Sequence, residues 1–242
     1  MFEVIINAFN IVLYRPIFNI LILFYNYLPG HDFGVSIIVL TIIIRLALYP
    51  TSVKAIKSQK TLNYIQPKIK EIQEKYKEDK EKQAQAIMEL YKKEKFNPFG
   101  GCLPILIQLP VLIALFQVLK NGLLSEQFSI IYSFIPAPQS INPLFLGLVN
   151  LTQASVAIAI FAGILQFLQT KMITPKTKGQ KNKKGSDFAA IMQKQMLYFF
   201  PFLTFFILLR LPSAIGLYWM VNSIFSIGQQ YLILKKQSSK ND

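Results

Sequence analysis

Apolar and polar positions fall in long blocks along this chain, not in the short periods typical of a soluble domain. Five blocks are almost entirely apolar: residues 33–52, 99–119, 144–170, 196–211 and 213–234. Helical residues rise about 1.5 Å each, so about 20 of them cross a hydrocarbon core of about 30 Å. The pattern therefore predicts an all-α integral membrane protein with five transmembrane helices. The third block is longer than needed, which implies tilt or an end outside the lipid.

The N-terminal segment, residues 1–30, has a different pattern. Within residues 17–28, four apolar residues share one helical face (Ile17, Leu21, Phe24 and Leu28), and two asparagines lie on another. Twelve residues are too few to span a bilayer, so we expect an amphipathic helix lying in the membrane interface. The alternative is a sixth span over residues 1–28, kinked at Arg15-Pro16, which would place Arg15 at a costly depth.

The longest polar segment, residues 53–95, predicts an antiparallel hairpin of two helices in the cytoplasm. A heptad seam runs along its first arm and is repeated on its second, through Leu62, Ile65, Ile69, Ile72 and Tyr76, then Ala84, Met88 and Tyr91. Pro67 is expected to start the first arm or to kink its link to the preceding span. The alternative is an amphipathic pair whose arms cover only each other.

The charges support one orientation of the chain. The net charge is +14, and the lysines cluster between the apolar blocks, with 12 Lys and 7 acidic residues in 53–95 and 7 Lys and one acidic residue in 171–194. Lysine-rich loops stay in the cytoplasm, so five spans place both segments and the C-terminus there. Residues 174–187 lack an apolar pattern and predict a flexible basic loop. Contact with nucleic acid, such as ribosomal RNA near the basic tail, is a minor alternative.

One permanent charge interrupts the first block, "VSIIVLTIIIRLALYP". Arg45 lies five residues before Pro50, and a charge at membrane depth costs several kcal/mol unless water or polar groups reach it. Thr41 and Tyr49 flank it at i−4 and i+4 on the same helical face. A polar stripe in this helix is therefore expected to run toward the cytoplasm.

Other spans carry matching polar positions. The candidates are Trp219, Asn222, Ser223, Ser226 and Gln230 in the fifth span, Gln166 and Gln169 in the third, and Gln108 in the second, where Gln117 faces the opposite way. Singly, such residues are usually hydrogen-bonding contacts between helices. Arg45 is different because no carboxylate lies within a span to neutralise it. An unpaired arginine among amides and hydroxyls predicts a hydrated groove.

The residues offer no catalytic or metal-binding constellation. No acidic residue lies in a span for a proton relay, and the chain has one histidine, His31, and one cysteine, Cys102. A metal site needs more ligands than these, and no phosphate-binding loop is present. The sequence therefore predicts no cofactor, no metal and no enzymatic activity.

Four segments, in order, resemble the YidC/Oxa/Alb membrane protein insertases: "GVSIIVLTIIIRLALYP", "QPKIKEIQEKYK", "NPFGGCLPILIQLPVLIALFQVL" and "LPSAIGLYWMVNSIFSIGQQ". The resemblance implies a five-helix core around a hydrophilic groove that is open to cytoplasm and lipid and closed on the outer side. It assigns the groove arginine to Arg45, the groove glutamine to Gln169 and an aromatic groove residue to Trp219. The hairpin 53–95 would receive substrate.

The resemblance also implies a function. It is that of an insertase and chaperone that inserts nascent membrane proteins into the bilayer of the bacterial inner membrane without nucleotide hydrolysis. The ribosome and the Sec translocase are the implied partners. Two alternatives stay open: a small-anion transporter or channel that uses Arg45, and a structural partner of another translocase. A transporter predicts internal repeats, and the two halves show no self-similarity.

Overall fold

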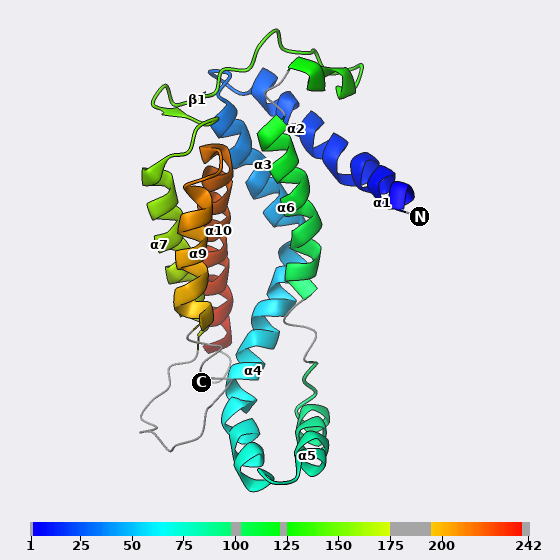
Figure 1. Ribbon diagram of the computed structural model, residues 1–242, viewed down its shortest axis with the longest axis vertical. Helices are drawn as coiled ribbons and strands as arrows, with labels where there is room; N and C mark the ends of the chain where they lie inside the picture. The colour runs from blue at the N-terminus through cyan, green and yellow to red at the C-terminus, as the bar shows by residue number, and fades with distance from the viewer. Residues whose placement is uncertain (1, 98–102, 122–124, 175–194, 239–242) are drawn as a thin grey trace.

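A computed structural model describes residues 2–97, 103–121, 125–174 and 195–238. It is mostly helical, and its longer helices run along one axis (Figure 1). The helices are α1 (Phe2–Phe9), α2 (Arg15–Tyr27), α3 (Phe33–Ala47), α4 (Tyr49–Lys75), α5 (Lys80–Lys93), α6 (Leu103–Asn121), α7 (Val156–Ile173), α9 (Phe200–Leu208) and α10 (Ser213–Ser238). Shorter elements are the π-helical η1 (Asn10–Tyr14) and η4 (Gln195–Phe199), the 3₁₀ turn η3 (Ser125–Ile130) and the strands β1 (Leu144–Phe145) and β2 (Val149–Asn150).

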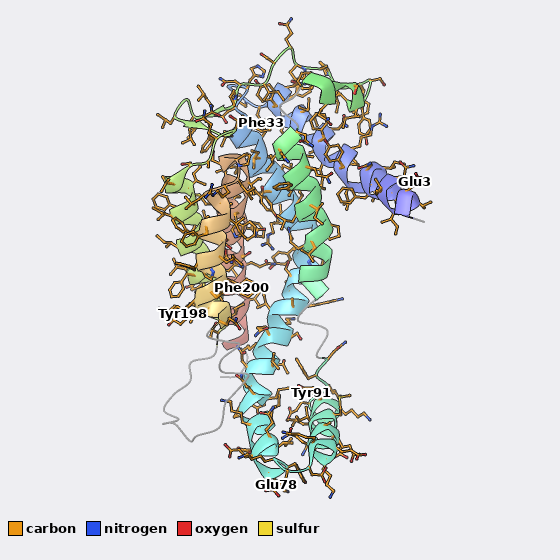
Figure 2. The ribbon with its side chains drawn as sticks, viewed as in Figure 1. Glu3, Phe33, Glu78, Tyr91, Tyr198 and Phe200 are labelled. Atoms are coloured by element: carbon orange, nitrogen blue, oxygen red, sulfur yellow. The ribbon has the colours of Figure 1, made fainter. Side chains whose placement is uncertain are left out.

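The N-terminal helix is longer than the sequence pattern predicted. The elements α1, η1 and α2 follow one another without a break, and Glu3–Tyr27 is long and apolar enough to cross a membrane. Pro16 lies in the first turn of α2, directly after the π-helical η1, and a proline is tolerated at such a position because its missing N–H is needed least there. The stretch slants away from the other helices, with Glu3 near its free end (Figure 2). An interfacial position for it therefore stays a prediction.

The first predicted span, residues 33–52, is not one straight helix. α3 ends at Ala47, and the chain bends by 66° at Leu48 before α4 begins at Tyr49. Pro50 lies in the first turn of α4, where its missing N–H costs no helical hydrogen bond. The bend removes the simple i, i+4 relation between Arg45 and Tyr49 on which the predicted stripe depended.

Helices α4 and α5 fold back on each other through a short turn at the end of the molecule, marked by Glu78 (Figure 2). Pro67 lies inside α4, so the prediction that it starts the first arm is wrong, and a kink at this residue stays a prediction. The predicted seam holds at Ile65, which is fully buried, but fails at Ala84 and Met88, which are exposed. On α5 the half-buried face instead contains Ala86, Ile87 and Leu90.

Two polar contacts stabilise this hairpin. Lys68 Nζ lies 2.6 Å from Glu94 Oε1, and this hydrogen bond raises the pKa of Lys68. Asp79 caps α5 by accepting a hydrogen bond from the Lys82 backbone N–H, which lowers the pKa of Asp79. A lowered carboxyl pKa means that the capped form is favoured at neutral pH, and that this contribution is lost as the pH falls through that pKa.

The third, fourth and fifth predicted spans differ from the structure in their bounds. Residues 144–155 are not helical, because β1 and β2 form a small antiparallel turn there, and α7 begins only at Val156. In the fourth block the helix ends at Leu208, and Arg210 lies in the following turn. In the fifth block α10 continues beyond residue 234 to Ser238. Most of the predicted basic loop, residues 175–194, lies outside the described residues.

Among the described residues, length and composition identify two helices that could cross a membrane, Glu3–Tyr27 and Val156–Ile173, and a third if α3 and α4 count as one bent span. The predicted second block starts within residues 98–102, which lie outside the described residues. α10 is long enough, but its polar stripe lowers its hydropathy. The structure is thus that of a mostly helical membrane protein, and the count of five spans stays a prediction.

The apolar core fills one half of the helix bundle. It is built from residues of five helices: Phe18, Leu21 and Ile22 of α2, Phe33, Ile37 and Leu40 of α3, Ala114, Leu115 and Val118 of α6, Ala159 and Ala162 of α7, and Ala214, Ile215 and Leu217 of α10. These positions lie at the end of each helix that is farthest from the α4–α5 turn. The opposite half of the bundle is therefore where polar side chains meet.

A cap, residues 125–155, closes the bundle at the core end. Asn19 is buried and holds the cap directly, because its Nδ2 donates to the Ile130 carbonyl and its Oδ1 accepts from the Tyr132 N–H. Arg15 adds a hydrogen bond to the Ile130 carbonyl and lies over the Tyr132 ring. Its charge is thus satisfied by the cap, which reduces the cost expected for an arginine at depth.

The close packing of α10 on α7 depends on one glycine. A Cβ at Gly216 would meet Ile158 Cγ2 at 2.5 Å, whereas a Cβ at Gly228 on the same helix would meet nothing within 4 Å. Alanine generally stabilises a helix interior over glycine by about 1 kcal/mol. We expect Gly228→Ala to keep or raise the melting temperature in detergent, and Gly216→Ala to lower it through overpacking. Equal melting temperatures for the two variants would contradict this packing.

Candidate functional site

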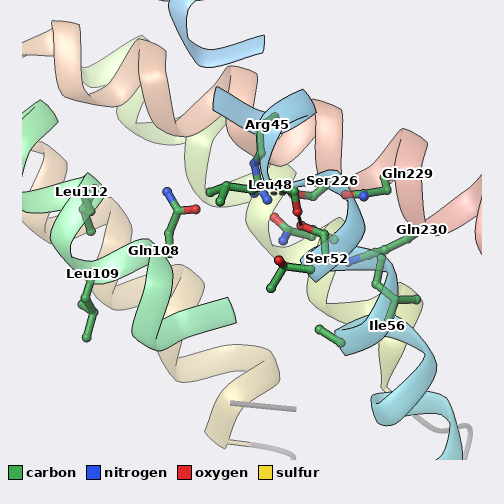
Figure 3. A pocket seen from close by; sticks show the side chains of 13 residues that line it. Arg45, Leu48, Ser52, Ile56, Gln108, Leu109, Leu112, Ser226, Gln229 and Gln230 are labelled. Carbon is green, nitrogen blue, oxygen red and sulfur yellow. Dashed lines mark hydrogen bonds between the residues drawn. The ribbon is translucent and has the colours of Figure 1, made fainter. Parts of the chain in front are cut away.

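A cavity of about 310 Å³ lies between the helices on the side of the core that faces the α4–α5 turn. Five helices contribute to its wall, and Figure 3 shows side chains of α3, α4 and α10 facing Gln108 of α6 across it. The lining residues are Arg45, Leu48, Thr51, Ser52, Ala55, Ile56, Gln108, Leu109, Leu112, Gln169, Ser226, Gln229 and Gln230. One charge, several amides and hydroxyls, and aliphatic side chains thus share one space.

Arg45 is the charged group of this cavity. Its Nε donates to Asn222 Oδ1 at 2.5 Å, and its Nη2 donates to Ser226 Oγ at 2.6 Å and to the Asn222 carbonyl at 3.4 Å. All three acceptors are neutral. The ion pairs Lys68–Glu94 and Lys82–Asp79 lie in the α4–α5 hairpin, and Arg45 forms no ion pair with any described residue. The guanidinium is therefore positioned by hydrogen bonds while its charge stays uncompensated.

The helix α10 provides the support for this arginine. Asn222 and Ser226 are four residues apart, so they lie on the same face of α10, toward α3. Ser226 Oγ also donates to the Asn222 carbonyl at 2.8 Å, which orients the hydroxyl oxygen toward Arg45. The polar stripe predicted along this helix thus has a definite partner at these two positions.

Three buried polar atoms near this site have no hydrogen-bond partner among the described residues: Ser223 Oγ, Gln229 Nε2 and Gln230 Oε1. The two glutamines line the cavity, and each side chain is about 5% exposed. Buried amides rarely stay unpaired, and a polar cavity of this volume has room for water molecules or for the polar groups of a ligand.

Of four further predicted residues, two line the cavity and two do not. Gln108 and Gln169 line it, and Gln108 Nε2 donates to the hydroxyl of Tyr218 at 2.6 Å. Gln166 and Trp219 do not line it. They bond to each other, with Trp219 Nε1 donating to Gln166 Oε1 at 2.9 Å, and so join α7 to α10.

The structure separates Thr41, Tyr49 and Ser223 from the cavity wall. Thr41 is buried, and its hydroxyl donates to the Ile37 carbonyl of its own helix at 2.6 Å. Tyr49 is 39% exposed beyond the bend and does not line the cavity. Ser223 is buried within the packing of α10. The predicted polar stripe of the first span therefore does not continue from Arg45 to Tyr49.

Residues of α4 take the place of Tyr49. Thr51, Ser52 and Ile56 line the cavity, although they were assigned to the end of a span or to the polar hairpin. A weak signal was present, since Ser52 follows Arg45 by seven residues, which is two helical turns. Gln229 was also missed, although it adjoins the predicted Gln230.

The arrangement is suited to binding a polar ligand. The cavity wall offers a cation, amide groups and hydroxyls, and these are hydrogen-bond donors and acceptors for a polar, electron-rich ligand. Across the described residues, no three His, Cys, Asp or Glu side chains gather where they could hold a metal ion.

Comparison with known proteins identifies the family. The model of the family described as 60Kd inner membrane protein matches residues 23–240. A membrane protein insertase YidC of Fusobacterium nucleatum is 36% identical over 205 residues, which cover 85% of this chain and 87% of the relative. One of Clostridium tetani is 34% identical over 217 residues, covering 88% of each chain.

Other relatives are much longer than this chain. A membrane protein insertase YidC of Pelobacter propionicus is 35% identical over 224 residues, which are 93% of this chain but 39% of the relative. The family match covers the cavity residues of α3, α4, α6, α7 and α10, and it agrees with the resemblance noted in the sequence. This chain belongs to the 60Kd inner membrane protein family.

Proposed function

We infer that this protein is a membrane protein insertase, which moves segments of newly made proteins into the bilayer of the bacterial inner membrane. Relatives that align over nearly their whole length carry the name membrane protein insertase. The observation in the structure that best supports this function is the uncompensated Arg45 in a cavity lined by amides and hydroxyls.

A hydrated cavity lowers the barrier that a polar client segment meets. Moving an unpaired polar or charged group into hydrocarbon costs several kcal/mol. The amides of Gln229 and Gln230 and the hydroxyl of Ser52 offer hydrogen bonds in place of bulk water. Arg45 adds a favourable attraction for acidic residues in the segment that must cross.

The apolar helix of the client supplies the driving force. Burial of apolar surface contributes about 25 cal/mol per Å², so a helix that leaves the cavity for lipid gains more than the transfer of a short polar segment costs. No nucleotide is needed for this step. Because the cavity occupies the half of the bundle nearer the hairpin, the polar segment has left to cross only a thickness equal to the cap half, where the apolar core lies.

The charges of the two ends support a definite orientation. The α4–α5 end is rich in lysine, whereas residues 127–155 of the cap contain no charged residue. We propose that the hairpin and the C-terminus face the cytoplasm, and that five spans enclose the cavity. α10 runs from the cap end to the hairpin end, so its C-terminus lies with the hairpin (Figure 1).

We also propose two partners. The basic segments, residues 171–194 and the C-terminal lysines, suit contact with the ribosome, and the Sec translocase is the second candidate. The small-anion transporter receives no support from the names of the relatives.

Reconstitution of the purified protein in liposomes tests this function. A radiolabelled single-span client with an acidic N-terminal tail is added, and protease protection of the tail reports its transfer. We expect protection with this protein alone and none in empty liposomes. Failure with this protein alone, and success once a translocase is added, would favour the structural-partner alternative. Chloride flux without client insertion would favour the transporter.

A further inference from the structure

The turn between β1 and β2 exposes three leucines at the cap end of the molecule. Leu144, Leu146 and Leu148 are 39%, 62% and 83% exposed, while Phe145 between them is half-buried and points inward. We call the three exposed side chains the leucine tip. In water, such a set would keep a large apolar surface hydrated at a loop end, where polar residues are usual.

The leucine tip is held in place by the protein. A Cβ at Gly34 would collide with the ring of Phe145, so the ring lies directly against the start of α3. The Leu146 N–H donates to Asp32 Oδ2 at 2.6 Å, and the Leu148 N–H donates to the Phe145 carbonyl at 2.9 Å. The leucines therefore project from a fixed turn.

One apolar side chain of the tip is attached to a backbone conformation that has an energetic cost. Leu146 has φ of 50°, in the left-handed region that glycine and asparagine adopt much more readily than a branched residue. Gly147, next to it, has φ of 71° and is the residue expected there. An exposed leucine in this conformation is a reason to look for a binding role.

The surroundings of the tip are apolar and uncharged. On α7, four apolar residues spaced by four positions are exposed along one face, namely Val156, Ile160, Ile164 and Leu168. In a membrane protein, such a stripe faces lipid. The β1–β2 turn lies at the cap end of α7 (Figure 1), and residues 127–170 carry no charge that would hold them in water.

We propose that the leucine tip inserts among the lipid acyl chains of the leaflet next to the cap, as a continuation of the lipid-facing stripe of α7. Because the turn is bonded to Asp32 and packed on Gly34, the insertion fixes the depth of α3, and with it the depth of Arg45. This proposal does not depend on the protein's binding a client.

Fluorescence quenching tests it. In a Cys102→Ser background, a single cysteine replaces Leu148, and an environment-sensitive dye is attached to it. The protein is reconstituted in vesicles of phosphatidylethanolamine and phosphatidylglycerol, with or without lipid brominated on its acyl chains. Labels at Ile164 and at Glu78 are the references for lipid and for water. Iodide, present on both sides of the vesicle membrane, is the aqueous quencher.

We expect the Leu148 label to be quenched by brominated lipid about as strongly as the Ile164 label, and by iodide several-fold less than the Glu78 label. A label at Leu144 should give the same result. Strong iodide quenching without quenching by brominated lipid would place the tip in water and overturn the proposal. Protection from both quenchers would mean contact with protein and would overturn it equally.

Discussion

Replacement of Arg45 with alanine is expected to abolish most insertion of clients whose crossing segment is acidic. Two opposite charges about 4 Å apart attract by about 4 kcal/mol at an effective dielectric constant of about 20. Even if desolvation cancels most of this, a net loss of about 1.4 kcal/mol lowers occupancy tenfold. The readout is the rate of client insertion in the reconstituted system, measured for clients with acidic and with neutral tails.

Two controls separate charge from packing in this prediction. Arg45→Lys keeps the charge but cannot make both side-chain hydrogen bonds, to Asn222 and to Ser226, with the geometry of the guanidinium. It should therefore keep much of the activity. The alanine variant should affect the acidic client much more than the neutral one. An equal loss for both clients would show that Arg45 acts through the fold, and full activity on the acidic client would exclude the charge from the mechanism.

Filling the cavity is expected to have the second largest effect. Ser52 lines the cavity, and its hydroxyl already bonds to the Leu48 carbonyl of its own chain. A phenylalanine at this position would occupy space that a client segment needs, and it would replace polar wall by apolar wall. Because the barrier for polar groups rises as water is displaced, we expect Ser52→Phe to reduce insertion of all polar-tailed clients to a small fraction of the wild-type rate.

The matched control is Ser58→Phe, a substitution on the same helix that does not touch the cavity. Both variants should reach wild-type levels in the membrane, and the melting temperature in detergent checks that each is folded. Retention of activity by Ser52→Phe, or its equal loss in both variants, would show that the cavity is not the path of the client.

The sequence was sufficient to predict that polar side chains of α10 would lie beside Arg45. A permanent charge without an acidic partner in any span has few physical solutions, and Arg45 with Asn222 and Ser226 follows from that constraint combined with helical spacing. Gln108 and Gln169 were also predicted, because amides deep in apolar helices need partners or water. In each case the inference depends on the energy of one residue and its position on a regular helix.

The sequence was insufficient where the chain departs from a regular helix. The 66° bend at Leu48 cannot be read from composition, since Leu, Tyr and Ala fit a straight helix equally well, and Pro50 is compatible with a first turn or a kink. The bend moved Tyr49 away and brought Ser52 in. The prediction of a span over residues 144–155 failed for a related reason. An uncharged, leucine-rich segment has the composition of a span even where it forms a cap.

The N-terminal stretch shows a third limit. Periodicity identified one face over residues 17–28, but the helical stretch begins at Phe2, and the π-helical η1 continues it up to Arg15-Pro16, where the alternative of a sixth span placed a kink. The buried Asn19 anchors the cap, which is 111 residues away along the chain at the Ile130 carbonyl. A contact this distant in sequence cannot be predicted from local pattern.

The most direct test of the account is photo-crosslinking between the protein and the acidic tail of a ribosome-arrested client. A photoreactive residue replaces Gln230, which lines the cavity, or Leu232, which is 61% exposed on the outside of the same helix. The account predicts that the tail cross-links to position 230 and not to 232, and that Arg45→Ala strongly reduces the product. Cross-linking at 232 with none at 230 would contradict it.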